Sequence, residues 1–479
     1  MKTNAALRVA LSASLLSVWL AGCMVGPNYK RPEVSAPAQF RAQAHPPESN
    51  SLADLPWWQV FSDKALQGLI VQSLNGNYDL QVAVTRIEQA RANVASVRSG
   101  LFPQIGYDVG ASRQEVFNPL QTQHNIVYNA VGWTLNAAWE ADIWGRVRRA
   151  TESARAALFA QQDVRRGVRL SLVSDVAANY FSLIELDRQL VIAQQSSRAY
   201  KQILDLFTNR FNAGRDSRLA VERAQAAYDS SNASIASVTR AIGQQENILS
   251  VLLGAYPRDI ERGSVLTAQT MPPTPVGQST ELLRRRPDIQ QAENVMISAN
   301  AQIGVAIASF YPRIGLSALF GGQAPHIDHI FDSSFRVWSI GAGLTGPIFQ
   351  GGQLRANYQQ SKAFWDETIA QYRGTVINAF RETSDALVAQ QTLVGERGAL
   401  ESQVNALQRS VDLSVQRYDD GRASYFEVLE AEQLLFAAQV ELAQTQRDQL
   451  LAVVNLYKAL GGGWNLNEAS WSNPQGNPQ

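Results

Sequence analysis

Few residues of this sequence have the type and spacing that catalysis requires. The 479 residues include one cysteine and four histidines, too few for a disulfide framework or for a zinc site built from several Cys and His ligands. His326, Asp328 and His329 stand close together between two expected strands, where a surface metal site and a plain polar loop tip are both compatible with the sequence. There is no phosphate-binding loop, nucleophile elbow or HExxH motif, so we predict that the protein is not an enzyme.

One glycine motif could in principle bind a dinucleotide. Gly341-Ala-Gly-Leu-Thr-Gly346 matches the GxGxxG pattern, and Asp366 follows twenty residues later. In a dinucleotide-binding fold this motif follows a buried parallel strand, whereas residues 334–340 alternate between apolar and polar side chains. The corresponding stretch of the first half, residues 134–139, lacks the glycines. We therefore expect no nucleotide and no other cofactor at this motif.

The single cysteine has chemistry of another kind, because it follows a signal sequence. Two positive charges precede a twelve-residue apolar core that ends at Leu20, the length of a signal-peptide core and too short to cross a bilayer. Leu20-Ala-Gly-Cys23 resembles the bacterial lipobox. That resemblance implies a lipoprotein signal peptide over 1–22 and a covalent lipid such as palmitate on Cys23. The residue after Cys23 is Met24 and not the aspartate that retains lipoproteins in the inner membrane, so the resemblance implies that the protein is located in the outer membrane. An ordinary signal peptide with an incidental cysteine is the alternative.

Composition excludes several classes of protein. Lys and Arg together number 42, as do Asp and Glu; a nucleic-acid binder would carry a basic surplus, so no nucleic-acid partner is expected. The apolar fraction of 45% is too high for a disordered chain. No window reaches about 18 apolar residues, so no helical membrane span is expected.

The prolines leave two long gaps that favour helix. None lies between Pro119 and Pro257 or between Pro347 and Pro474, and both gaps are rich in Ala, Gln, Leu, Glu and Arg. We expect helices at about 79–101, 145–211, 216–253, 288–310, 353–418 and 425–460. A 66-residue helix is about 100 Å long. The apolar stripes of Val404, Leu407, Val411 and Tyr418, and of Leu450, Val453, Tyr457 and Leu460, indicate hairpins packed as coiled coils.

Two short motifs occur twice. Phe102-Pro-Gln-Ile-Gly106 matches Tyr311-Pro-Arg-Ile-Gly315, and Arg210-Phe-Asn-Ala-Gly214-Arg-Asp-Ser217 matches Arg417-Tyr-Asp-Asp-Gly421-Arg-Ala-Ser424, at offsets of 209 and 207 residues. Near-constant offsets predict a two-fold internal repeat. We divide the chain into a signal peptide (1–22), a lipidated extended segment (23–78), a first repeat (79–256), a central linker (257–287), a second repeat (288–460) and a Gly-rich polar tail (461–479).

Each repeat contains two expected strands. They lie at about 104–113 and 126–140 in the first repeat and at about 313–322 and 335–346 in the second. Apolar and small or polar residues alternate along them, as in Trp133-Thr-Leu-Asn-Ala-Ala-Trp139. Ten-residue alternating runs with aromatic ends are typical of transmembrane β-strands, although a soluble sandwich is the alternative. Four strands cannot close a barrel and an open edge cannot lie in lipid, so we expect an oligomer. Both strand pairs begin and end on the helical side, and a lipid on Cys23 in the inner leaflet of the outer membrane would place that side in the periplasm.

Motifs along nearly the whole chain carry a family resemblance. They are Cys23-Met-Val-Gly-Pro-Asn-Tyr-Lys-Arg-Pro32, Trp57-Trp58 with Phe61, Leu283-Arg-Arg-Arg-Pro-Asp-Ile289 and Asn455-Leu-Tyr-Lys-Ala-Leu-Gly-Gly-Gly-Trp464. With them the chain resembles an outer-membrane efflux factor of the TolC superfamily, in the lipoprotein branch of OprM/CusC-like components of RND pumps. The resemblance implies an α+β membrane protein: a homotrimer with a twelve-stranded β-barrel, four strands per chain, continued by a long periplasmic α-helical tunnel. It also implies a periplasmic adaptor (membrane fusion) protein and an inner-membrane RND transporter as partners.

The two repeated turns are candidate functional residues. Gly214 and Gly421 would supply the left-handed turn between antiparallel helices. The resemblance implies that these turns are periplasmic tips that contact the adaptor, through Arg210, Gly214 and Ser217 in the first turn and Arg417, Gly421 and Ser424 in the second. A plain hairpin turn is the other interpretation, and both can hold.

The helix start after the second turn carries an acidic pair. Glu427 and Glu430 are spaced i, i+3 and therefore share one helix face. The resemblance implies that Phe426, Glu427 and Glu430 form a periplasmic gate facing the pore, whereas an exposed acidic helix start favoured by the helix dipole is the alternative. Gln433 stands where some relatives have an arginine, which weakens the case for a salt-bridge latch there.

The prediction is a passive exit duct of a tripartite efflux pump that passes drugs or other small toxic compounds out of the cell. Two alternatives stay open. A type I secretion duct for polypeptides is disfavoured by the lipobox and the Leu-Gly-Gly-Gly-Trp464 ending, and a non-channel periplasmic coiled-coil lipoprotein is disfavoured by the four alternating strands.

Overall fold

A computed structural model describes residues 24–34, 36–43, 50–118, 124–270 and 272–472. The expected signal peptide and the lipidation site at Cys23 lie outside these residues. None of the described helices combines the length and the apolar character needed to cross a membrane.

The chain divides into two compact units, and each unit contains segments from both halves of the sequence. The first consists of Met1–Glu33, Thr85–Gln162 and Gln291–Arg373, and the second of Val34–Val84, Asp163–Gln290 and Gly374–Gln479. These units cut across the expected repeats, because tertiary contacts join equivalent parts of the two halves. The internal repeat itself stays a prediction.

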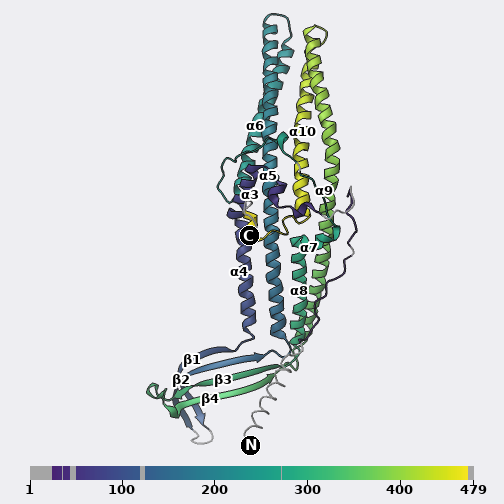
Figure 1. Cartoon of the computed structure of the whole chain (residues 1–479). Helices are drawn as coiled ribbons and strands as arrows, with labels where there is room; N and C mark the ends of the chain where they lie inside the picture. Colours follow the sequence, from purple (N-terminus) through teal and green to yellow (C-terminus); the bar gives the residue numbers. More distant parts are fainter. Residues whose placement is uncertain (1–23, 35, 44–49, 119–123, 271, 473–479) are drawn as a thin grey trace. The chain divides into compact units, whose positions relative to one another are not determined.

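The first unit contains one antiparallel sheet of four strands. The strands are β1 (Gln104–Asn118), β2 (His124–Ala141), β3 (Arg313–Ala324) and β4 (Arg336–Thr345), paired in the order β1-β2-β3-β4 (Figure 1). All four expected strands are confirmed, and β1 continues five residues beyond the expected end. Pairing between β2 and β3, with Leu135 opposite Phe320, joins the two halves of the chain.

One face of this sheet is apolar and exposed. Residues directly opposite one another in an antiparallel ladder point to the same face, so the registers place Tyr107, Leu135, Phe320 and Trp338 in one row across all four strands. In the single chain Tyr107 is 78% exposed and Trp338 is 70% exposed. The same face includes Ile105, Val109, Trp133, Ala137, Leu316, Ala318, Ile340 and Leu344, whereas the other face includes Gly106, Asp108, Thr134, Asn136, Ser317, Ser339, Gly341 and Gly343. A contiguous exposed apolar face of this kind marks an interaction surface.

The six expected helices are confirmed within two residues at each end. In the first half they are α4 (Tyr78–Ser99), α5 (Arg146–Asn212) and α6 (Arg218–Leu252), and in the second half α8 (Pro287–Ala308), α9 (Gln353–Asp419) and α10 (Tyr425–Ala459). Corresponding helices have equal lengths of 22, 67 and 35 residues. The short helices are η1 (Leu52–Asp54), α2 (Trp57–Val60), α3 (Lys64–Gly76), η2 (Leu266–Ala268), η3 (Ser279–Glu281), α7 (Leu282–Arg285), η4 (Ile327–His329), η5 (Ser333–Phe335) and α11 (Glu468–Ser472).

The second unit contains most of two long helical hairpins, α5–α6 and α9–α10, whose long helices α5 and α9 begin in the first unit. In the α9–α10 hairpin Val411 is buried with Ala431 and Leu435, and Val404 and Leu407 pack against them. The expected stripe is therefore the buried seam of a coiled coil. In the α5–α6 hairpin the seam contains Tyr200, Ile203, Leu204, Phe207, Ala224 and Ala227.

The expectation of an extended segment over 23–78 is wrong for its last third. The prolines end at Pro56, and the chain then forms α3. The carboxylate of Asp63 accepts hydrogen bonds from the backbone N–H groups of Ala65 and Leu66 and so caps this helix. Leu66, Leu69, Ile70 and Leu74 form a buried stripe at helical spacing.

The expectation of a polar tail over 461–479 is also wrong where the chain is described. Gly461 and Gly463 have φ of 75° and 70°, and Gly461 to Gly463 are buried. Trp471, in α11, is buried, and its carbonyl accepts a hydrogen bond from the indole N–H of Trp57 at 3.1 Å. Apolar packing against the N-terminal helices thus holds this segment in the core.

Candidate functional site

The two repeated turns have the same backbone geometry. Gly214 has φ of 68° and Gly421 has φ of 71°, a region that favours glycine because a Cβ clashes there. The N–H of Arg215 donates to the carbonyl of Arg210 at 2.9 Å, and the N–H of Arg422 donates to that of Arg417 at 2.8 Å. This is the Schellman arrangement that ends a helix, so the hairpin turns predicted from the sequence are confirmed.

The two serines after these turns differ in what they do. Ser217 Oγ accepts a hydrogen bond from the N–H of Ala220 at 3.3 Å and caps α6. The Ser424 side chain makes no capping hydrogen bond, and only its carbonyl accepts from the N–H of Glu427 at 3.1 Å. The second tip therefore lacks the side-chain cap of the first.

An aromatic cluster joins the two tips to each other. The guanidinium of Arg210 lies 4.9 Å from the ring centroid of Tyr418, close enough for a cation–π contact. Tyr425 meets Tyr418 edge to face at 4.8 Å and Phe207 edge to face at 4.7 Å. The Tyr418 hydroxyl is buried and has no hydrogen-bond partner among the described residues. Burial, followed by the charges of Glu432 and Asp419, raises the pKa of Tyr425.

Sequence reasoning placed Arg210 in a tip but missed its partner on the other hairpin. Tyr418 belongs to the apolar stripe and to the repeated turn motif but is not among the expected contact residues, and neither are Tyr425 and Phe207. The signal was present as aromatic residues within a few positions of both turns, but nothing local says that the two turns are neighbours.

The acidic pair lines a groove between α9 and α10. Glu427 and Glu430 border about 560 Å³ of space together with Arg409, Leu413 and Arg417, so they share one face as the spacing predicts. Glu427 forms an ion pair with Arg417, with 3.7 Å between Oε2 and Nε. Both side chains are about half exposed, so the pair contributes at most about 1 kcal/mol. Among the described residues Glu430 has no ion-pair partner.

The cation next to this acidic pair is Arg417, in the last turn of α9, and not the residue at position 433. Gln433 is exposed on α10, and Arg417 of α9 is the residue that reaches Glu427. Phe426, the third expected gate residue, is 54% exposed. Its ring lies 5.3 Å from the guanidinium of Arg223 on α6, so within one chain it is a second contact between the hairpins.

The two other sequence motifs do not form ligand sites in the described residues. His329 Nδ1 lies 2.8 Å from Asp332 Oδ2 and Nε2 lies 3.6 Å from Asp328; the hydrogen bond to Asp332 and the charge of Asp328 raise the pKa of His329. No group of three or more His, Cys, Asp or Glu side chains in the described ranges could hold a metal ion. The glycine motif lies largely in the antiparallel strand β4, and α9 begins only at Gln353, so the strand-to-helix turn of a dinucleotide site is absent.

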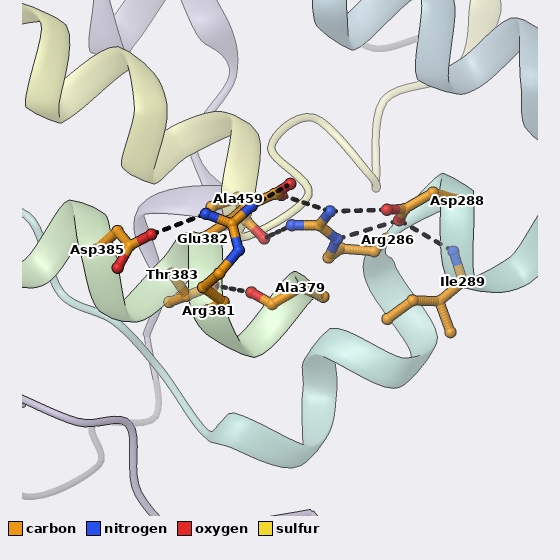
Figure 2. A network of polar contacts seen from close by, with 9 residues as sticks. All are labelled: Arg286, Asp288, Ile289, Ala379, Arg381, Glu382, Thr383, Asp385 and Ala459. Atoms are coloured by element: carbon orange, nitrogen blue, oxygen red, sulfur yellow. Dashed lines mark hydrogen bonds and ion pairs between the residues drawn. The ribbon is translucent and has the colours of Figure 1, made fainter. Parts of the chain in front are cut away.

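The Leu283–Ile289 motif builds a buried polar network in the second unit. Arg286 donates to Asp288 through Nε at 3.0 Å and Nη2 at 2.7 Å, and to Glu382 through Nη2 at 2.8 Å. Its Nη1 donates to the carbonyl of Ala459 at 2.9 Å (Figure 2). One side chain thereby connects the start of α8, the middle of α9 and the end of α10.

Comparisons with known proteins cover nearly the whole chain. The family model described as "Outer membrane efflux protein" matches residues 69–255 and 279–462. The probable efflux pump outer membrane protein TtgC of Pseudomonas putida is 34% identical over 461 residues, which is 95% of this chain and 95% of that protein. The solved structure of the outer-membrane channel OprN is 30% identical with a TM-score of 0.86, covering 92% of this chain and 100% of that one.

An open channel is among the similar structures. The open state of the MtrE outer membrane channel of Neisseria gonorrhoeae is 30% identical to this chain with a TM-score of 0.81. The match covers 92% of this chain and 99% of that chain. The fold described above is thus the fold of outer-membrane channels.

Proposed function

The chain belongs to the outer membrane efflux protein family, within the TolC superfamily, and from that premise we propose that it is the outer-membrane exit duct of a tripartite efflux pump. The single observation that carries the proposal is the apolar face of the four-stranded sheet, with Tyr107 and Trp338 largely exposed in the single chain. Lipid is the environment in which such a face is stable. The family consists of transport proteins of the outer membrane, and the part of the chain that the structure describes contains no catalytic constellation at the sites considered above.

The duct is a homotrimer with a twelve-stranded barrel and a helical periplasmic tunnel. Within the described residues the sheet of one chain has two free edges, the outer sides of β1 and β4. Unpaired backbone N–H and C=O groups each cost several kcal/mol in lipid, so the edges must pair with other copies. Three copies of four strands supply twelve. The equal lengths of corresponding helices support an internal repeat, which gives each copy two hairpins.

The work of transport is done by partners. We assign a periplasmic adaptor to the two hairpin tips (Arg210, Gly214, Ser217, Arg417, Gly421 and Ser424) and an inner-membrane RND transporter as the source of substrate. A lipid on Cys23 anchors the chain in the outer membrane. The substrates are drugs or other small toxic compounds, the class named in similar proteins such as the antibiotic efflux pump outer membrane protein ArpC of Pseudomonas putida.

Glu430 is the residue that opposes closure of the duct. In a trimer the acidic pairs place six carboxylates around one axis, and two like charges about 8 Å apart repel by about 2 kcal/mol at an effective dielectric of 20. Arg417 offsets the charge of Glu427, whereas Glu430 has no such partner in the described part of the chain. Protonation or a bound cation at Glu430 therefore favours the closed state, with Phe426 narrowing the aperture.

Single-channel currents in a planar bilayer test this proposal. We expect the wild type to show small, flickering conductance, and Glu430→Gln to lose the dependence of that conductance on pH and divalent cations. Glu441→Gln, an exposed acid further along α10, is the matched control and should behave as the wild type. A trimer whose pH and cation dependence survives Glu430→Gln would refute the gate assignment. Purified protein that is only monomeric and carries no current would refute the duct and favour the coiled-coil lipoprotein.

A further inference from the structure

The first described residues of the chain are fixed against the start of α5. The N–H of Val25 donates to the carbonyl of Trp144 at 3.2 Å. Arg149, almost fully buried, donates to the carbonyls of Val25 and Gly26 at 3.2 Å each and to Asn28 Oδ1 at 2.9 Å. These bonds hold the neighbouring Met24 in place, and its position is therefore a property of the fold.

Met24 forms one wall of a groove of about 410 Å³ in the first unit. The groove is lined by basic and by apolar side chains. The basic residues, here called the rim, are Arg98 of α4 and Arg148 and Arg155 of α5, and the apolar residues include Leu101, Ala156, Phe159 and Ile297. Phe159 is 50% exposed, although it is a large apolar side chain. A pocket with this lining fits a ligand that has an anionic end and an apolar body.

Among the described residues, acidic side chains balance only part of the positive charge of the rim. Arg148 is paired with Asp142 at 3.3 Å, and Glu152, the acid that also lines the groove, is paired with Arg149 at 2.8 Å. Arg98 and Arg155 are exposed and have neither a hydrogen-bond acceptor nor an ion-pair partner among the described residues. Two guanidinium groups are therefore available to an external anion.

The groove lies at the end of the sheet where β1 begins and β2 ends. Leu101 precedes the first residue of β1 by three positions, and β2 ends at Ala141. Trp139 and Trp144 stand at the same strand end; the indole of Trp139 donates to the carbonyl of Leu101 at 3.0 Å, and Trp144 stacks on Tyr311 at 4.6 Å. Tryptophan and tyrosine at strand ends mark the level of the lipid headgroups in a membrane.

We propose that this groove binds the anionic phosphodiester headgroup of a membrane phospholipid. Arg98 and Arg155 contact the phosphate, while Leu101, Phe159 and Ile297 contact the glycerol and the first methylenes of the acyl chains. The inference rests on the membrane placement of the sheet in the proposed function. A guanidinium suits a phosphate because its planar N–H groups donate to two oxygens at once. The bound lipid fixes the depth of the channel in the membrane.

Native mass spectrometry of the detergent-purified protein, titrated with phosphatidylglycerol, tests the proposal. Each basic side chain near a membrane surface contributes about a fivefold factor to anionic lipid binding. We expect Arg98→Gln/Arg155→Gln to bind phosphatidylglycerol about thirty-fold more weakly than the wild type. Diacylglycerol with the same acyl chains should bind the wild type as weakly as phosphatidylglycerol binds the variant, and inorganic phosphate should not compete.

The matched control is Arg86→Gln/Arg240→Gln, which removes two exposed arginines outside the groove and should leave lipid binding unchanged. Equal phosphatidylglycerol affinity in wild type and groove variant would overturn the proposal, as would an equal loss in the control. Equal affinity for diacylglycerol would indicate a purely apolar groove, and competition by inorganic phosphate a free-anion site; both also overturn it. The oligomeric state in the same spectra, and unchanged conductance of the groove variant, separate this outcome from a failure of the proposed duct.

Discussion

Arg286 allows a stability prediction to be worked from the structure. We consider Arg286→Met, because methionine keeps most of the apolar stem while removing the guanidinium. The Arg286 side chain is only 8% exposed and makes three hydrogen bonds to carboxylates and one to the carbonyl of Ala459. Asp288 and Glu382 are 45% and 43% exposed, so water replaces the guanidinium at both once it is lost.

The expected loss is about 3 kcal/mol. The re-solvated carboxylates limit the cost to roughly 0.5–1 kcal/mol for each of their three bonds, and the carbonyl left without a donor adds about 1 kcal/mol. An unfolding entropy of about 2.1 cal/mol/K per residue gives about 1 kcal/mol/K for 479 residues. The midpoint of thermal unfolding should therefore fall by about 3 °C. Arg286→Lys should recover about half of this, because an ammonium cannot form the two parallel bonds to Asp288.

Circular dichroism at 222 nm during heating of the purified protein measures the midpoint. Arg381→Met is the matched control in the same network (Figure 2): Arg381 pairs with Asp385 at 2.9 Å, but its side chain is 59% exposed. An exposed pair of this kind contributes about 0.5 kcal/mol, so the control should melt within about 1 °C of the wild type. If Arg286→Met has the same unfolding midpoint as the wild type, or if the midpoints of both variants fall by the same amount, the assignment of the stability to the burial of Arg286 is refuted.

Three further predictions concern single residues. Gly421→Ala should destabilise the second tip by about 1 kcal/mol because its φ of 71° is strained for alanine, measured as faster amide exchange near the turn; Gly395→Ala, in the helix, should show no such loss. Tyr418→Phe should leave the melting midpoint equal or higher, because it removes a buried hydroxyl without a described partner, and a clear fall would show that the hydroxyl is bonded. Burial alone would raise the pKa of Asp63, but hydrogen bonds from Gln269, Ser264 and Tyr180 lower it below its ordinary value. Its stabilisation is therefore complete above about pH 4 and is lost as pH falls through the lowered pKa; Asp63→Asn should flatten this acid limb of the melting midpoint, and an unchanged limb would refute the role.

Local structure was determined by the sequence to a large extent. Helical composition and spacing place α5 and α9 within one residue of their ends, because a helix closes its hydrogen bonds within four residues. Two-residue alternation finds the four strands, and Gly214 and Gly421 mark the turns that only a residue tolerant of positive φ forms easily. The helix α3 is not expected from the sequence, because the six prolines that precede it favour an extended segment.

Partnerships between distant residues were decided by the tertiary structure alone. The alternation predicts that Leu135 and Phe320 each lie on the apolar face of their own strand. Only the β2–β3 register shows that both lie on the same face of the sheet. The spacing in the sequence places Glu427 and Glu430 on one helix face. Only folding brings Arg417 to Glu427 and Arg210 to Tyr418.

The core network around Arg286 and the lipid groove also depend on contacts between residues far apart in the sequence. Arg286 reaches the carbonyl of Ala459 across 173 residues of sequence, and the groove gathers Met24, Arg98 and Arg155 from three separate segments. Sequence periodicity records which side of an element is apolar, since that depends on neighbours along the chain. Which elements meet depends on how all the apolar faces are buried together, and that is settled only when the whole chain packs.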